Sequence, residues 1–160
     1  MSIQEGDKIP GATLHSMRDG KPTPMTTEEI FAGKKVVLFA VPGAFTPTCS
    51  MAHLPGYVVN ADSIKAKGVD TIACISVNDA FVMSAWGDAC GVGDKVDMLS
   101  DGNGEMAAAL GLVLDASGGG LGIRIQRFAA IVEDGVVTAL NLEKPGAFEV
   151  SNAETILDQV

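Results

Sequence analysis

A cysteine stands where an apolar run of the chain gives way to a short loop. The stretch is VLFAVPGAFTPTCS, residues 37–50, and the cysteine is Cys49. Thr46 is a residue type that caps helix N-termini, and Pro47 suits the first helical position. Cys49 is then expected in the first helical turn, where unpaired backbone N–H groups and the helix dipole favour a thiolate. Since the thiolate is the nucleophile, this position predicts a reactive cysteine; the alternative is a small buried residue at a well-capped helix start.

Other reactive or metal-binding arrangements of this cysteine have less support. His53 lies one turn further along the helix and could approach, but no second histidine or Asn signature completes a papain-like site. We expect His53 to hydrogen-bond locally and to shape the pocket. With only two histidines, a mixed Cys/His metal site would need Cys74 or Cys90 beside Cys49, and the spacing does not suggest it. No CxxC pair occurs. The sequence therefore predicts neither a metal site nor an organic cofactor.

Length and charge narrow the class of protein. The 160 residues suit a single domain, 1–160, and the net charge of −9 disfavours binding to nucleic acid. The longest apolar run has about six residues, whereas a membrane helix needs about 20. MSIQEGDKIP at the N-terminus lacks the pattern of a signal peptide. We expect a cytoplasmic protein without membrane association, in which an odd cysteine count argues against a disulfide framework.

The order of predicted elements indicates the fold. Fully apolar strands are expected within 34–41 and 69–78, and a third strand within 95–101. Helices are expected in 26–35 with a Thr26–Glu29 capping box, in 49–68 with a bend at Pro55 and Gly56, in 80–91 with Asn78 and Asp79 as caps, in 104–112, and in 151–160 with Ser151 or Asn152 as cap. The segment 127–143 predicts a hairpin turning at Asp134-Gly135. Parallel crossovers followed by an antiparallel hairpin and a covering helix predict an α/β, thioredoxin-like mixed sheet between helices.

The loop residues resemble a known family. Pro42, Thr46 and Cys49 meet the PxxxTxxC pattern of peroxiredoxin active-site loops. PGAFTPTCS, followed by HLPGY and ACISVNDAFVMSAWG, resembles the type II, or peroxiredoxin-five-like, subfamily, and the likeness runs from EGDKIP to the C-terminal helix. The resemblance implies a thiol-dependent peroxidase that reduces hydrogen peroxide or small alkyl hydroperoxides.

The resemblance also implies roles for single residues. Cys49 would be the peroxidatic cysteine, Thr46 would hydrogen-bond the thiolate and the peroxide, and Pro42 would shield the site from water. The catalytic arginine of the family precedes the apolar strand near the end, which here is Arg127; Arg124 is a second candidate, ranked below it. A fixed cation and a hydroxyl donor would stabilise the oxygen that leaves the peroxide.

The remaining cysteines bear on how Cys49 is recycled. Cys74, inside an apolar strand, is expected to be a buried, inert thiol, with a resolving cysteine as the alternative. Cys90 ends a helix and could be exposed. Some members of the subfamily carry a resolving cysteine near the C-terminus, and this chain has none there. We therefore expect a one-cysteine cycle with an external thiol, either glutathione with glutaredoxin or thioredoxin.

Two further expectations concern signalling and assembly. A peroxide sensor on the same fold, oxidised at Cys49 with little turnover, is the alternative function. The resemblance implies a homodimer, and Phe45, Phe81 and Trp86 could form its contact patch, with the core as the other place expected for Trp86.

Overall fold

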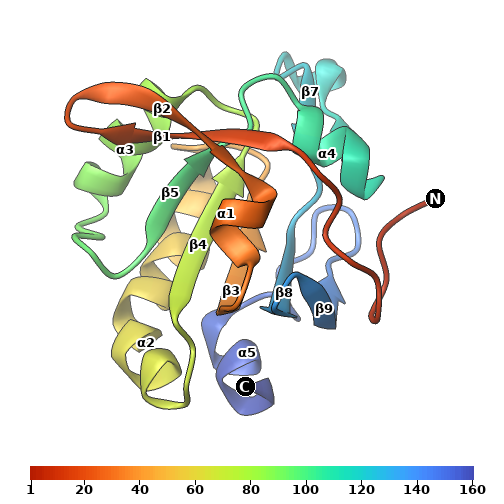
Figure 1. Ribbon diagram of the computed structural model, residues 1–160. Coiled ribbons are helices and arrows are strands. Elements are labelled where there is room, and N and C mark those ends of the chain that lie inside the picture. Colours follow the sequence, from red (N-terminus) through yellow and green to blue (C-terminus); the bar gives the residue numbers. More distant parts are fainter.

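Seven strands of the chain pair into one sheet in the computed structural model, which describes residues 1–160. They are Thr13–Arg18 (β1), Lys21–Thr26 (β2), Lys35–Ala40 (β3), Thr71–Ser76 (β4), Asp97–Ser100 (β5), Phe128–Glu133 (β8) and Val136–Leu142 (β9). Their order across the sheet is β2-β1-β5-β4-β3-β8-β9 (Figure 1). A separate two-stranded sheet pairs Val113–Asp115 (β6) with Ile123–Ile125 (β7).

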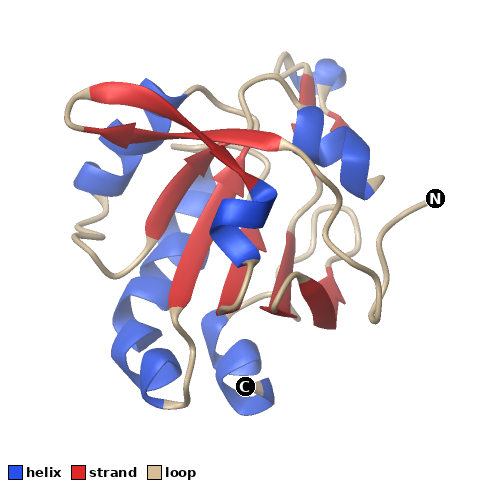
Figure 2. Ribbon diagram, viewed as in Figure 1, coloured by secondary structure: helices blue, strands red, loops and turns tan.

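Helices cover both faces of the large sheet (Figure 2). They are Thr27–Phe31 (α1), Leu54–Ala66 (α2), Ala80–Ala89 (α3), Glu105–Leu110 (α4) and Ala153–Gln159 (α5), with a π-helical segment over Cys49–His53 (η1) and a 3₁₀ turn over Ser117–Gly119 (η2). Buried apolar side chains of α1 and α4 pack on one face of the sheet and form a first apolar layer. Those of α2, α3 and α5 pack on the opposite face and form a second. In Figure 1, α1 lies in front of the sheet and α2 behind it. No helix is both long and apolar enough to span a membrane.

The strand directions confirm the predicted fold class. β3, β4 and β5 are parallel neighbours, while the β8–β9 hairpin joins β3 in the antiparallel direction. Both central strands are buried almost throughout, as their apolar sequences predicted. The result is the thioredoxin-like arrangement, a mixed sheet between helices.

Local capping and turn predictions are also confirmed. Thr26 and Glu29 form both hydrogen bonds of a capping box at α1, and Asp79 caps α3 by accepting from the Val82 N–H. Asn152, one of the two residues expected to cap the last helix, accepts from the Thr155 N–H. Asp134 and Gly135 both have positive φ angles, of 48° and 78°, as a type I′ hairpin turn requires.

The N-terminal hairpin was absent from the predicted element order. β1 and β2 pair antiparallel around Asp19 and Gly20, whose φ angles of 50° and 76° match the same turn type. Pro22 and Pro24 lie in β2, which is the edge strand of the sheet. An edge position tolerates proline because half of its N–H groups have no strand partner. The Asp-Gly signal was therefore present, and the prolines obscured it.

The irregularity expected at Pro55 and Gly56 lies one turn earlier. Pro55 sits in the first turn of α2, and the preceding turn is the π-helical segment η1, where the Leu54 N–H bonds to the Cys49 carbonyl five residues back. Proline lacks an N–H and its ring crowds the carbonyl four residues before it, so a wider turn relieves the clash. The reactive-cysteine candidate thus begins a π-helical turn.

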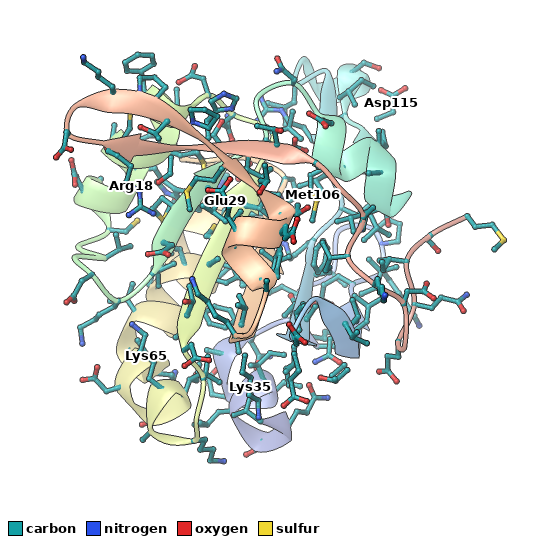
Figure 3. The ribbon with its side chains drawn as sticks, in the orientation of Figure 1. Arg18, Glu29, Lys35, Lys65, Met106 and Asp115 are labelled. Carbon is teal, nitrogen blue, oxygen red and sulfur yellow. The ribbon has the colours of Figure 1, made fainter.

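The small sheet joins the first apolar layer through Ile125 of β7, and Figure 3 shows Asp115, the last residue of β6, at the outer edge of the molecule. The glycine-rich segment SGGGLG, at 117–122, forms its turn. Asp115 accepts hydrogen bonds from both the backbone N–H and the hydroxyl of Ser117, at 3.0 and 2.6 Å, which lowers the pKa of this carboxyl. The turn is followed by β7, which contains Arg124 and ends two residues before Arg127.

Candidate active site

Cys49 is the third residue of a helix that starts at Pro47. The Thr46 carbonyl accepts the first intrahelical bond, from the Ser50 N–H at 2.9 Å, so Thr46 has the predicted N-cap position. The N–H groups of Thr48 and Cys49 have no backbone acceptor. The cysteine is fully buried, and its sulfur therefore faces protein groups rather than bulk water. Polar donors fixed around that sulfur decide its chemistry.

Arg127 contacts the sulfur directly. Its Nη2 donates to the Cys49 Sγ at 3.1 Å. The antiparallel register of β3 and β8 pairs Ala40 with Phe128, which places the next pair, Val41 and Arg127, at the end where the cysteine loop begins. A permanent cation thus lies beside the candidate nucleophile although the two residues are 78 positions apart.

Two aromatic rings hold the Arg127 guanidinium in place. Its Nη1 donates to the Nδ1 of His53 at 2.7 Å, and its Cζ lies 5.7 Å from the centroid of the Phe148 ring. The His53 and Phe148 rings also pack together, with centroids 4.9 Å apart. Arg127 is therefore oriented before any substrate arrives.

His53 is a buried, neutral acceptor. Its Nε2 lies 2.9 Å from the Ser151 carbonyl, which also accepts from the Tyr57 hydroxyl at 2.8 Å. A carbonyl cannot donate, so this contact assigns the ring proton to Nε2 and leaves Nδ1 free to accept from Arg127. Burial, and next to it the Arg127 charge, lower the pKa of His53 from 6.5 to about 3.

Glu143 anchors the far end of this hydrogen-bonded series. Its carboxylate accepts from the backbone N–H groups of Glu149, Val150 and Ser151 and from the Ser151 hydroxyl, at 2.7 to 3.0 Å. Burial opposes ionisation, but the bonds from Ser151, Glu149 and Val150 hold the pKa of Glu143 below its ordinary value. The Cys49 network, defined as Cys49, Arg127, His53, Ser151 and Glu143, is continuous from sulfur to carboxylate.

The loop before the cysteine is held by a second arginine. Arg124 donates from Nη1 to the Pro42 carbonyl at 3.3 Å and from Nε to the Leu121 carbonyl at 2.8 Å. A Cβ on Gly43 would lie 2.9 Å from this guanidinium, so a larger residue there would displace the Arg124 side chain. Arg124 therefore contacts the loop backbone, while Arg127 contacts the sulfur.

The Thr46 hydroxyl points differently from the expectation. It donates to the Gly43 carbonyl at 2.7 Å and makes no hydrogen bond to Cys49. The reason is local: Phe45, with a φ of 63°, turns the chain back so that the Gly43 carbonyl meets the hydroxyl. The Thr46 hydroxyl therefore bonds within the loop that precedes the cysteine helix.

Two side chains from other elements brace this loop and turn. Asn78, between β4 and α3, accepts from the Ala44 N–H at 3.0 Å and from the Ser76 hydroxyl at 2.7 Å. Trp86 of α3 is fully buried and donates from Nε1 to the Ser50 hydroxyl at 3.0 Å. Its predicted place in an exposed contact patch is therefore wrong, because its indole fills the core behind the cysteine helix.

The other two cysteines have different surroundings. Cys74 is fully buried in β4, opposite Phe39 of β3, and burial raises the pKa of its thiol well above the ordinary value. This confirms the expected burial of Cys74, and its inertness in the cycle stays a prediction. Cys90 is half-buried at the end of α3, and burial raises the pKa of this thiol as well. All three cysteines are free thiols.

A pocket of about 320 Å³ borders the cysteine site. It shares Pro42, Thr48 and Arg127 with the surroundings of the sulfur, and its other lining residues are Leu114, Gln126, Glu143, Lys144, Pro145, Gly146 and Ala147. No three His, Cys, Asp or Glu side chains in the molecule are grouped so that they could hold a metal ion. Cys49 itself does not line the pocket, but Thr48 beside it in the chain and Arg127, which bonds its sulfur, do.

The C-terminal part of this site could not be predicted from the sequence. Ser151, Glu143 and Phe148 belong to no motif, and they reach His53 and Arg127 only because the chain from β9 to α5 folds over the η1 segment. His53 itself stands out in the sequence as a histidine one turn after Cys49. Its partners were expected to be local, whereas Ser151 is 98 residues away.

Comparisons with known proteins place this geometry in context. The Redoxin family profile matches residues 4–157. The chain is 55% identical to peroxiredoxin-2E-2, chloroplastic, of Oryza sativa subsp. japonica, covering 98% of this chain and 72% of that protein. It is 52% identical to peroxiredoxin-2E, chloroplastic, of Arabidopsis thaliana, covering 98% and 68%. Among solved structures, reduced Prx3 of Vibrio vulnificus in complex with hydrogen peroxide has 57% identity, 98% coverage of both chains and a TM-score of 0.95.

Proposed function

Because the chain belongs to the type II peroxiredoxins, which are thiol peroxidases, we propose that it reduces hydrogen peroxide and small alkyl hydroperoxides through Cys49. One observation carries the proposal: the Arg127 Nη2 lies 3.1 Å from the Cys49 sulfur while its Nη1 is held by His53. A cation fixed at that place stabilises both the thiolate and the negative charge that develops on a peroxide oxygen. The Vibrio vulnificus relative was solved with hydrogen peroxide, which supports the choice of substrate.

The proposed first step consumes one peroxide. The Cys49 thiolate attacks one oxygen, the S–O bond forms, and the O–O bond breaks. Two electrons pass from sulfur to the peroxide, whose second oxygen leaves as water or an alcohol after taking up a proton. Cys49 becomes a sulfenic acid. Arg127 and the free N–H groups of the first helical turn are the donors available to the two oxygens.

Pro42 and Thr46 have supporting roles in this proposal. Pro42 lines the pocket and limits access of water to the sulfur. The Thr46 hydroxyl, now bonded to Gly43, can rotate to donate to a bound peroxide, since its donor is not tied to the helix. No metal or organic cofactor takes part.

An external thiol completes the proposed cycle. It attacks the sulfenic sulfur, releasing water and forming a mixed disulfide, which a second thiol reduces. Cys74 is buried in a central strand and the C-terminal segment holds no cysteine, so the resolving thiol comes from outside the chain. Glutathione with glutaredoxin, and thioredoxin, are the two candidate donors.

A homodimer is part of the same proposal. Phe45 and Phe81 are 55% and 62% exposed, and Met51 and Val59 on the cysteine helix are each 81% exposed. A partner subunit would cover apolar side chains such as these. The cytoplasmic location stays a prediction.

The decisive experiment compares Cys49→Ser with the wild type. Wild-type protein should consume peroxide continuously when a thiol donor is supplied, and Cys49→Ser should consume none while keeping its circular dichroism spectrum. Substantial turnover in the variant would overturn the assignment. Consumption of one equivalent followed by a halt, with every donor tried, would favour the peroxide sensor instead.

A further inference from the structure

We propose that the pocket beside Cys49 binds a small carboxylate-bearing co-substrate and that Lys144 binds its carboxylate. The inference rests on the proposed peroxidase function, because the co-substrate is defined by its reaction at Cys49. It concerns the pocket lined by Pro42, Thr48 and Arg127 on the sulfur side and by the Lys144–Ala147 turn on the other.

The pocket is larger than peroxide alone requires. A water molecule occupies about 30 Å³ of the liquid, so hydrogen peroxide, with two oxygens, needs roughly twice that. The pocket holds about 320 Å³, at the lower end of the range for sites that bind small organic molecules. Its size therefore fits a molecule of several functional groups, one of which reacts at the sulfur.

The charges of the pocket select an anion. Its lining contains two cations, Arg127 and Lys144, and one carboxylate, Glu143. Both oxygens of Glu143 already accept hydrogen bonds from the 149–151 segment, so its carboxylate is engaged there and keeps its negative charge. Arg127 is bonded to Cys49 and His53, whereas the exposed Lys144 ammonium makes no ion pair and no hydrogen bond. Lys144 is thus the available partner for a ligand carboxylate.

Backbone structure fixes where Lys144 stands relative to the sulfur. The Glu143 N–H bonds to the Arg127 carbonyl at 3.1 Å, which sets Lys144 one residue beyond the position opposite Arg127. Lys144 then begins a turn closed by the bond from the Ala147 N–H to its carbonyl at 2.9 Å, with Pro145 and Gly146 in the centre. Gly146 has a φ of 76°, as the third residue of a type II turn requires. The lysine therefore stands at the start of a defined turn that lines the pocket together with Pro42 and Thr48.

Two kinds of co-substrate share this chemistry. One is a thiol reductant with a carboxylate, which would attack the Cys49 sulfenic acid and release water. The other is a hydroperoxide with a carboxylate, which would oxidise the thiolate and leave as an alcohol. In both, the reactive end lies at Cys49 and the anionic end at Lys144.

The test compares charged and neutral partners in Lys144→Gln. For the thiol arm, rapid-quench mass spectrometry measures the rate constants of the sulfenic form with 3-mercaptopropionate and with neutral 2-mercaptoethanol. For the hydroperoxide arm, oxidation is measured with linoleic acid hydroperoxide and with neutral cumene hydroperoxide. In each arm we compare the rate constant for the carboxylate partner with that for the neutral partner. In one arm this ratio should be about fivefold lower in Lys144→Gln than in the wild type, the effect of losing one partly exposed ion pair. The arm that responds identifies the co-substrate.

Lys21→Gln is the matched control, because it removes the same charge from an exposed position on β2, on the edge strand of the large sheet. Its ratios should equal those of the wild type. The proposal is overturned if neither ratio responds to Lys144→Gln, or if Lys21→Gln lowers the same ratio equally, which would indicate overall charge.

A binding measurement separates this inference from the peroxidase proposal. Calorimetric titration of Cys49→Ser protein with S-methylglutathione and with octanoate requires no turnover. At least one should bind, and adding Lys144→Gln should weaken its binding about fivefold. If binding depends on Lys144 but the wild-type protein consumes no peroxide, only the proposed function is contradicted. Absence of binding by both probes, in a protein that consumes peroxide, would contradict the carboxylate site only.

Discussion

Arg127 donates from Nη1 to the Nδ1 atom of His53 at 2.7 Å, and its other terminal nitrogen lies 3.1 Å from the Cys49 sulfur. The ring can accept this bond because its proton is on Nε2, facing the Ser151 carbonyl. His53 is thus a positioning residue: it acts on the sulfur through the guanidinium and makes no hydrogen bond to Cys49 itself.

Loss of this acceptor should slow the first chemical step. In His53→Ala the Arg127 guanidinium loses its fixed direction, and the rate of Cys49 oxidation by hydrogen peroxide should fall about tenfold, less than for loss of the donor itself. His53→Gln can still accept from Arg127 and donate to Ser151, so it should recover most of the rate. The measurement is stopped-flow oxidation. Equal losses in the two variants would show that ring packing, not the hydrogen bond, matters.

The two arginines should differ in their effect on rate. Arg127→Met should lower peroxidase kcat/KM about a hundredfold or more, since a preorganised donor at the sulfur is removed. Arg124→Met should do less, because Arg124 reaches the loop only through the Pro42 carbonyl. Steady-state assays on both variants decide the matter. If Arg124→Met were crippled and Arg127→Met near normal, the wrong arginine would have been assigned.

Buried His53 should make the fold sensitive to mild acid. Its pKa is about 3 in the folded protein against 6.5 for an exposed histidine, mainly through burial. Between these values the unfolded chain binds the extra proton, so the free energy of unfolding falls as pH falls below 6.5 and is fully retained above it. Urea titrations should show a loss of about 2 kcal/mol between pH 7.5 and pH 5. His53→Gln should show a smaller loss over the same range, and an identical loss would assign the sensitivity to other groups.

The protein should sediment as a homodimer at micromolar concentration. Phe81→Glu, on the exposed start of α3, should shift it towards monomer because a charge would be buried in an apolar contact. Val113→Glu is the control, at an exposed apolar position on the small sheet. A wild-type monomer in sedimentation would refute the dimer, and equal effects of both substitutions would place the contact elsewhere.

Cys49 should be the only cysteine that the cycle requires. Cys74→Ser and Cys90→Ser should keep most of their activity with glutathione and glutaredoxin, because Cys74 has a strongly raised thiol pKa in a closed core and Cys90 ends a different helix. After one equivalent of peroxide without donor, mass spectrometry should find Cys49 as sulfenic acid. A Cys49–Cys74 or Cys49–Cys90 disulfide as the main species would establish a two-cysteine cycle.

Much of this fold could be predicted because its signals are local. The capping box at Thr26, the Asp79 cap and the Asp134-Gly135 turn are each encoded within four adjacent residues, and each forms as predicted. The position of Cys49 in the first helical turn follows in the same way from Thr46 and Pro47. Even the missed N-terminal hairpin carried its turn signal at Asp19-Gly20.

The contacts that surround the sulfur depend on tertiary structure. Arg127 reaches Cys49 through the register of β3 with β8, and Ser151 reaches His53 through the packing of the C-terminal segment over η1, across 78 and 98 residues of sequence. The sequence left Trp86 either in the core or in a contact patch, because a helical apolar face does not reveal which neighbour covers it, and the tertiary structure places it in the core. Local hydrogen-bonding rules therefore determine where the nucleophile stands, whereas strand register and helix packing decide which charges and rings surround it. Strand register and helix packing depend on the free energy of the whole core rather than on any short stretch of residues.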